Sequence, residues 1–178
     1  MVTKNKSKNT AGASISESSA RSSQEANAED GVANTKIIEP IPEYLAAASE
    51  KVIRGENNTW IVLGRDRPGT RRSGKGGRGE THCGSIDLVV GRMGYKAATV
   101  NSSGKKLYVD PDYINDASRV IISQRTDIDK NMNLSKGKIG NSENRAAIAL
   151  KSDSIRIAAR QGIKLVTMVD ETTSTGSP

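Results

Sequence analysis

The sequence lacks phenylalanine altogether, and aromatic residues make up only 3% of its 178 positions. One tryptophan and four tyrosines are the whole aromatic complement. A compact globular core normally depends on aromatic rings for much of its buried area. Because only 34% of the residues are hydrophobic, the core must come mainly from Ile, Val and Leu, which favours a thin, layered β structure over a broad globule.

Cysteine and histidine are each present once, as Cys83 and His82. A single cysteine excludes an internal disulfide, and leaves open an intermolecular disulfide or a buried thiol. One cysteine and one histidine cannot supply the four side chains of a zinc site, so no metal is expected. No apolar run approaches the roughly 18 residues that a membrane span needs. The charged stretch at residues 1–10 is not followed by an apolar one, so no secretion signal is expected either.

Acidic residues are fewer than basic ones, with 20 Asp and Glu against 27 Lys and Arg, which gives a formal net charge of +7. This balance fits either an ordinary mixed-charge surface or an acidic partner. Part of the excess lies in a Gly- and Arg-rich loop at residues 65–84, and the guanidinium fork pairs well with carboxylates and with phosphates. The loop lacks the interleaved aromatic residues that single-strand binders use for stacking. It therefore predicts contact with an acidic neighbouring protein through Arg65, Arg67, Arg71, Arg72, Lys75 and Arg78, and nucleic acid is the weaker alternative.

Two nucleotide-like patterns overlap in this loop, but both are incomplete. Residues 69–75 match the first seven positions of a phosphate-binding P-loop, and residues 74–79 spell the glycine pattern of dinucleotide-binding proteins. Gly76 stands where a P-loop needs Ser or Thr for magnesium, and the glycines at 76–79 are not expected to begin the helix that both motifs require. The acid pairs Asp110/Asp112 and Asp127/Asp129 fit turns better than acid–base chemistry. We therefore predict no cofactor, no catalytic residue and no enzymatic activity.

The order of elements along the chain predicts a mostly β protein with an extended N-terminal arm. Residues 1–36 are too polar to offset their ordering entropy, so the arm, residues 1–45, is expected to be disordered alone or ordered only on assembly. A β-rich body follows at residues 46–170 and a polar tail at 171–178. A helix of about two turns is expected at 43–51. Strands are expected at 60–63, 85–90, 106–109 and 119–123.

Residues 147–168 carry a regular ladder of aliphatic pairs, Ile148/Leu150, Ile155/Ile157 and Ile163/Leu165. One polar or small residue stands inside each pair, which is the period of a half-buried strand, whereas a helix would place the two members about 200° apart. Three such rungs have an open edge and half a core, so they are not stable alone. The ladder predicts a homotrimer built as a short β-helix or β-prism, and a small monomeric β-sandwich is the alternative. The expected trimer core is Ile148, Leu150, Ile155, Ile157, Ile163, Leu165, Ile86 and Leu88.

The ladder AIALKSDSIRIAARQGIKLVT, residues 147–167, resembles the intertwined β-helix repeats of tailed-phage virion proteins, of which the central spikes of contractile tails are best known. Two further stretches, WIVLGRDRPG at 60–69 and SQRTDIDKN at 123–131, also resemble phage structural proteins. The resemblance covers about residues 60–168. It implies a trimeric structural protein of the virion, assembled in the host cytoplasm. Spikes of the familiar type carry an oligonucleotide-binding-type barrel before the β-helix, and this sequence does not supply its five regular strands.

These observations together predict a trimeric decoration (cement) protein that stabilises the head shell of a tailed phage. Its partners would be copies of itself and the capsid protein or other virion subunits, with no membrane contact. A baseplate or tail-tip spike component is the first alternative. A nucleic-acid-binding protein that uses the Arg/Gly-rich loop is the alternative of another class.

Overall fold

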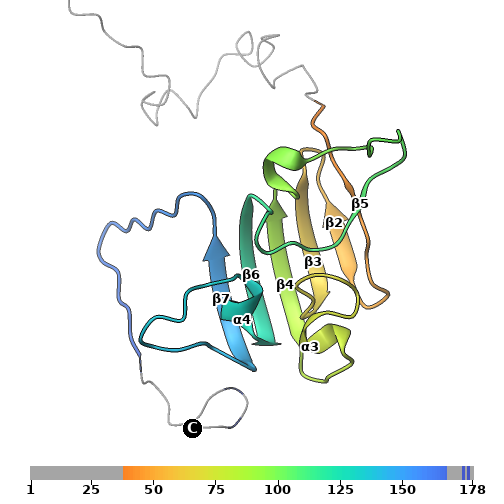
Figure 1. Cartoon of the computed structure of the whole chain (residues 1–178). Helices are drawn as coiled ribbons and strands as arrows, with labels where there is room; N and C mark the ends of the chain where they lie inside the picture. The colour runs from red at the N-terminus through yellow and green to blue at the C-terminus, as the bar shows by residue number, and fades with distance from the viewer. Residues whose placement is uncertain (1–37, 168–173, 175, 177–178) are drawn as a thin grey trace, which may run out of the picture. The chain divides into compact units, whose positions relative to one another are not determined.

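The computed structural model describes residues 38–167 together with 174 and 176. Its main element is a five-stranded antiparallel sheet with the strand order β2-β3-β4-β6-β7 (Figure 1). A two-residue parallel pair, β1 with β5, lies outside this sheet. The strands are β1 (Glu43–Tyr44), β2 (Lys51–Arg54), β3 (Thr59–Arg65), β4 (Gly84–Val90), β5 (Tyr108–Val109), β6 (Ser118–Thr126) and β7 (Arg145–Lys151).

Helical structure in the described residues is limited to short turns. These are α3 (Gly74–Gly77), α4 (Ile128–Asn131) and a 3-10 turn at Gly94–Lys96. The predicted mostly β class is therefore confirmed. The strands predicted at 60–63, 85–90 and 119–123 lie inside β3, β4 and β6, and the one predicted at 106–109 is reduced to β5.

The helix predicted at residues 43–51 is wrong. The structure has β1 and the start of β2 there, with a loop between them. Tyr44 is buried and its ring lies 6.1 Å from that of Trp60. The Glu50 carboxylate accepts hydrogen bonds from the Ala47 amide and from Arg67. These tertiary contacts outweigh the modest helical preference of the Leu-Ala-Ala-Ala run, which is at most a few tenths of a kcal/mol per residue.

The predicted boundary between arm and body at residue 45 also moves, because Tyr44 belongs to the core. Residues 1–37 lie outside the described residues, as does most of the predicted tail at 171–178. The predictions made for these two segments therefore stay predictions.

One side of the sheet, the covered face, packs against loops and holds the described core. One cluster joins Trp60, Val62 and Val89 of the sheet to Tyr44. A second cluster joins Ile121 to Tyr113 from a loop and to Ile128 and Met132 at the two ends of α4. Alternate residues of β3, β4 and β6 point to this side, as the two-residue period of a strand requires.

Buried arginines fill much of the space that aromatic residues would occupy in a larger core. Arg119 is fully buried, donates to Asp87 and Asp116 at 2.8 Å each, and lies over the ring of Tyr113 at 4.1 Å. Arg92 is 0% exposed and stacks over Tyr44 at 4.2 Å. Guanidinium groups stack well on aromatic faces while they keep carboxylate partners. The few aromatic side chains of the core thus pack against buried arginines, which supply part of the volume that further rings would fill.

Candidate assembly interface

The other side of the sheet, here called the bare face, is apolar and uncovered. Antiparallel pairing places its residues in register across all five strands. One row runs Ile53, Ile61, Leu88, Val120 and Leu150, and the next runs Leu63, Ile86, Ile122 and Ile148, with Val90 beside the first row.

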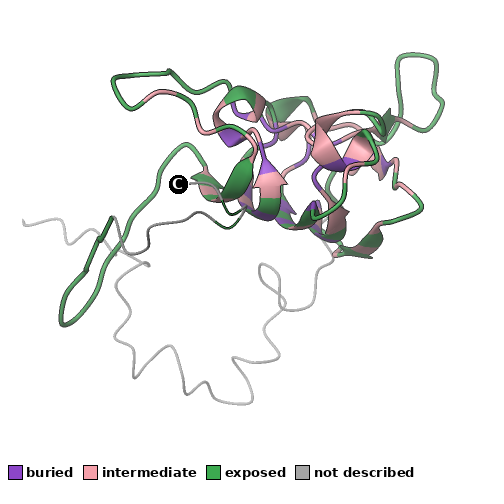
Figure 2. Ribbon diagram, turned by 90° about the horizontal axis from the view of Figure 1, so that it is seen from below, coloured by how far each residue is buried: buried purple, intermediate pink, exposed green. Residues whose placement is uncertain are grey.

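Neighbouring residues on β6 show how different the two faces are. Ile121, on the covered face, is 0% exposed, whereas Ile122, on the bare face, is 44% exposed. Ile148 on the edge strand β7 reaches 74%. Buried and more exposed residues alternate along β3, β4 and β6, and Figure 2 shows the two kinds together in the sheet. A sheet with one solvated face normally carries polar residues there, so an aliphatic bare face indicates a surface made to be covered.

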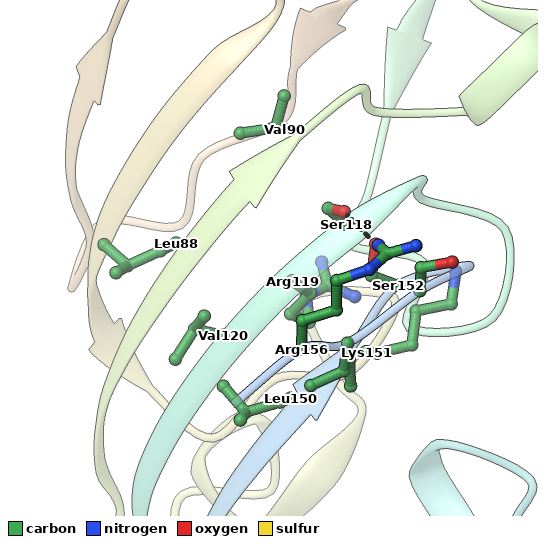
Figure 3. A pocket seen from close by; sticks show the side chains of 11 residues that line it. Leu88, Val90, Ser118, Arg119, Val120, Leu150, Lys151, Ser152 and Arg156 are labelled. Carbon is green, nitrogen blue, oxygen red and sulfur yellow. Dashed lines mark hydrogen bonds between the residues drawn. The ribbon is translucent and has the colours of Figure 1, made fainter. Parts of the chain in front are cut away.

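Two apolar grooves lie on the bare face. The first is lined by Leu88, Val90, Val120 and Leu150, which come from three adjacent strands (Figure 3), and its wall continues into Ile155 beyond the end of β7. The second lies at the other end of the same strands and is lined by Leu63, Ile86, Ile122 and Ile148 together with small and polar residues. The first groove therefore extends from the sheet to the second rung of the ladder, at Ile155.

The later rungs of the ladder have no strand partner in the described chain. Only the first predicted rung is a strand, as part of β7; residues 155–157 and 163–165 belong to no strand and pair with no other segment of the described chain. The expected strands there are thus not found in the single chain, because a strand needs a neighbour for its backbone hydrogen bonds. The side chains of this segment are exposed throughout.

The structure divides the eight residues of the predicted trimer core into two sets of four. Ile86, Leu88, Ile148 and Leu150 lie together on the bare face. Ile155, Ile157, Ile163 and Leu165 lie on the unpaired segment and are all at least half exposed. No residue of either set is buried within its own chain, and the trimer itself stays a prediction.

Sequence reasoning missed the contribution of β2 and β3 to this surface. Ile61 and Leu63 alternate with the buried Trp60 and Val62, so β3 is apolar on both faces. A strand that is apolar on both faces is typical of a sheet covered on both sides. That signal was present in the sequence, although only the register shows that Ile53 completes the row.

The basic loop contributes fewer exposed cations than predicted. Arg67 is a correction, because it is 5% exposed and pairs with Glu50 at 2.7 Å and with Asp110 at 2.8 Å. Arg65 donates to the Glu80 carbonyl, and Lys75 pairs with Asp127 at 3.3 Å. The three candidates that remain exposed are Arg71, Arg72 and Arg78.

The P-loop-like residues do form one turn of helix, α3, contrary to prediction. Its amides are already occupied: Lys75 donates to the Asp66 carboxylate at 2.7 Å, and Gly76 and Gly77 donate to the Asp66 carbonyl. A Cβ at Gly76 would lie 2.7 Å from that carbonyl oxygen, so glycine is needed for this close approach. The amides that would bind a phosphate in a P-loop bind the chain's own Asp66 instead.

His82 and Cys83 lie at the junction between the loop and β4. Cys83 is buried, and its thiol donates to the Thr81 carbonyl at 3.1 Å. Burial raises the pKa of this thiol, which favours the neutral form. Within the described part of the chain, no group of three or more His, Cys, Asp or Glu could hold a metal ion. No helix of that part is long and apolar enough to cross a membrane.

Three of the four acids in the predicted turn pairs stabilise loops, as expected, whereas Asp110 pairs with Arg67. The Asp112 carboxylate accepts from the amides of Ile114 and Asn115. Asp127 and Asp129 accept from the amides of Asn144 and Ser142 and so tie the loop at 132–144 to α4.

The ion pair of Glu50 and Arg67 predicts an acid-sensitive fold. Burial raises the pKa of Glu50, but hydrogen bonds from Arg67 and the Ala47 amide outweigh it, so the pKa lies below its ordinary value of 4.5. A depressed carboxyl pKa stabilises the fold above the unfolded-state value and loses that effect as the pH falls through the folded-state value. As the pH drops below about 4.5, the free energy of unfolding is expected to decrease. The Glu50→Gln variant is expected to be less stable than the unchanged protein at pH 7, and its free energy of unfolding should decrease less steeply with pH. Urea unfolding from pH 7 to pH 3 checks this, and equal slopes for both proteins would contradict it.

A comparison with known proteins identifies no relative of the chain. No protein-family model, no curated protein and no solved structure matches the chain.

Proposed function

We propose that this chain is a structural protein that assembles into a homotrimer through its bare face. The observation that carries the proposal is the extent of that face. Nine of its aliphatic side chains are exposed by between 37% and 74%. They form one continuous patch of rows across the strands of the sheet. Single exposed apolar residues are ordinary on a soluble monomer, whereas a large contiguous patch marks an interaction surface.

A second copy of the chain is the occupant that the sequence pattern favours. The unpaired segment 153–167 repeats the aliphatic pair of β7 at a spacing of seven to eight residues. It adjoins the first groove, so the sheet and the segment offer one continuous apolar surface. A partner that repeats the same pattern can cover both parts and complete the missing strand pairing. Closed cyclic symmetry then limits the assembly to a fixed number of copies.

Three copies fit this surface better than two. Each rung of the segment offers only two inward side chains, which is too little for a face-to-face sandwich of two layers. Three chains around one axis enclose such narrow rungs from all sides. The three bare faces would then line a β-prism, and the three segments would continue it as a short β-helix.

The place of the trimer that we propose is the head shell of a tailed phage, as a decoration protein. The support is the resemblance of residues 60–69, 123–131 and 147–167 to phage structural proteins. A trimer that binds where capsid subunits meet stabilises the assembled shell over free subunits by mass action. Exposed arginines of the loop and the polar N-terminal residues would supply the contacts to the shell.

A tail-tip component is the second candidate, because the ladder also fits a trimeric plug. Copy number separates the two candidates: a head protein is expected in hundreds of copies per particle, and a tail-tip trimer in about three. Quantitative gel staining of purified particles, with antibody labelling in the electron microscope, measures this directly. Label on tails with bare heads would contradict the head assignment, and absence from the particle would contradict both.

A further inference from the structure

The loop between β3 and β4 is held rigidly by groups buried beneath it. Asp66 is fully buried and binds three successive amides of α3, as described above. On its other side, the Asp66 amide donates to the Cys83 carbonyl at 2.7 Å, which closes the base of the loop. The tip is closed by Ser73, whose hydroxyl accepts from the Gly69 amide at 2.8 Å and donates to the Thr70 carbonyl at 2.7 Å.

Arg67 anchors the same loop to the body of the protein. Its guanidinium donates to Glu50, Asp110 and the Gly69 carbonyl at between 2.7 and 2.9 Å. It also lies over the ring of Tyr44 at 5.3 Å. The loop conformation is therefore fixed by the fold, although most of the loop surface faces solvent.

Gly77 brings together the two backbone segments that carry the exposed arginines. Its backbone lies against residues 71 and 72, so that a Cβ at Gly77 would be 2.8 Å from the Arg72 carbonyl carbon and 3.0 Å from the Arg71 oxygen. Arg78 follows Gly77 directly. The three exposed arginines are thus attached to two backbone segments that contact each other. We call Arg71, Arg72 and Arg78 the arginine platform.

Nearby carboxylates are committed elsewhere. Glu80 pairs with Arg125 at 3.2 Å, Asp127 pairs with Lys75, and Asp110 and Glu50 pair with Arg67. Among the described residues, no carboxylate forms an ion pair with the arginine platform, so its positive charge is available to another molecule. Because the loop is already ordered, a partner does not have to offset the entropy of fixing it.

We propose that the arginine platform is a docking surface for a carboxylate-rich patch on a protein partner. The planar guanidinium binds a carboxylate through two parallel hydrogen bonds, and clustered forks give such a patch both affinity and orientation. Nucleic acid is disfavoured because residues 65–83 contain no Phe, Tyr or Trp on which bases could stack. The arginine platform would make the contacts of the virion protein proposed above. Only the identity of the partner rests on that function.

The test compares two triple variants with the same change in net charge. Arg71, Arg72 and Arg78 are replaced by glutamate in one, and the exposed Lys105, Lys106 and Lys138 in the other. Binding to immobilised poly-L-glutamate and to a DNA duplex of roughly 20 base pairs is measured for each full-length protein at two salt concentrations. The platform variant is expected to lose about tenfold or more in affinity for poly-L-glutamate, and the lysine variant about twofold or less.

A third variant, Gly77→Ala, tests the clustering while all charges are kept. It is expected to weaken binding to poly-L-glutamate several-fold, because the added methyl group must push the two backbone segments apart. Equal losses in the two triple variants, absence of binding by the unchanged protein, or tighter binding to the duplex than to poly-L-glutamate would each overturn the proposal. Sedimentation of every variant reports the oligomeric state separately, so failure of the trimer is not confused with failure of the platform.

Discussion

The Ile122→Asp variant is expected to be a folded monomer. Ile122 lies near the centre of the bare face, in register with Ile86 on one side and Ile148 on the other. In the single chain its side chain is 44% exposed, so the isolated subunit tolerates a carboxylate there. In a trimer three carboxylates would be buried close together without partners, at a cost of roughly 3 kcal/mol or more per chain. Sedimentation velocity reports the assembly state, and circular dichroism reports the fold.

Two further aspartate variants make this result specific. Ile139→Asp is the matched control, because Ile139 is fully exposed on the loop at 132–144, away from the bare face; it is expected to remain a trimer. Ile157→Asp places the charge on the unpaired segment and is expected to prevent assembly if the segment belongs to the same core. An Ile122→Asp protein that still sediments as three chains would contradict the role given to the bare face.

The Asp116→Ala variant is expected to lose about 3–5 kcal/mol of unfolding free energy, which is the usual effect of removing one partner from a buried ion pair. Asp116 is 1% exposed and accepts hydrogen bonds from Arg119 and from the Met93 amide at 2.8 Å each. It is also the ion-pair partner of Arg92, at 3.7 Å. Without Asp116, Arg92 would lose this carboxylate and Arg119 would keep Asp87 alone.

Urea unfolding of the Ile122→Asp background measures this change without a contribution from assembly. Asp153→Ala is the control, since Asp153 is exposed, and its effect is expected to stay within about 0.5 kcal/mol. A loss below about 1 kcal/mol for Asp116→Ala would show that the arginines of the covered face are stabilised mainly by their aromatic contacts.

Strands with regular alternation could be predicted from the sequence, because period two is a local property. This holds for β3, β4 and β6, and for the apolar pair of β7. The residues of 43–51 could not be predicted in the same way. Their structure depends on Trp60, Arg67 and β5, which are distant in sequence, and local preference for helix gave the wrong answer.

The buried arginines could not be found from sequence either. Arg119 lies two residues before Ile121 in β6, so the two-residue period of a strand places both on the covered face. A charged residue in a strand is nevertheless expected at the surface unless a buried partner is known. Asp87 comes from β4, and its pairing with Arg119 exists only once the sheet register is formed. The same reason explains why Arg67 was wrongly assigned to the surface of the basic loop.

The molar mass of the purified chain in solution tests the central claim most directly. Sedimentation equilibrium over a range of concentrations is expected to give three times the mass of one chain. A mass equal to one chain at all concentrations, with a single cooperative thermal transition, would contradict the account, because the bare face would then be stable in water without a partner.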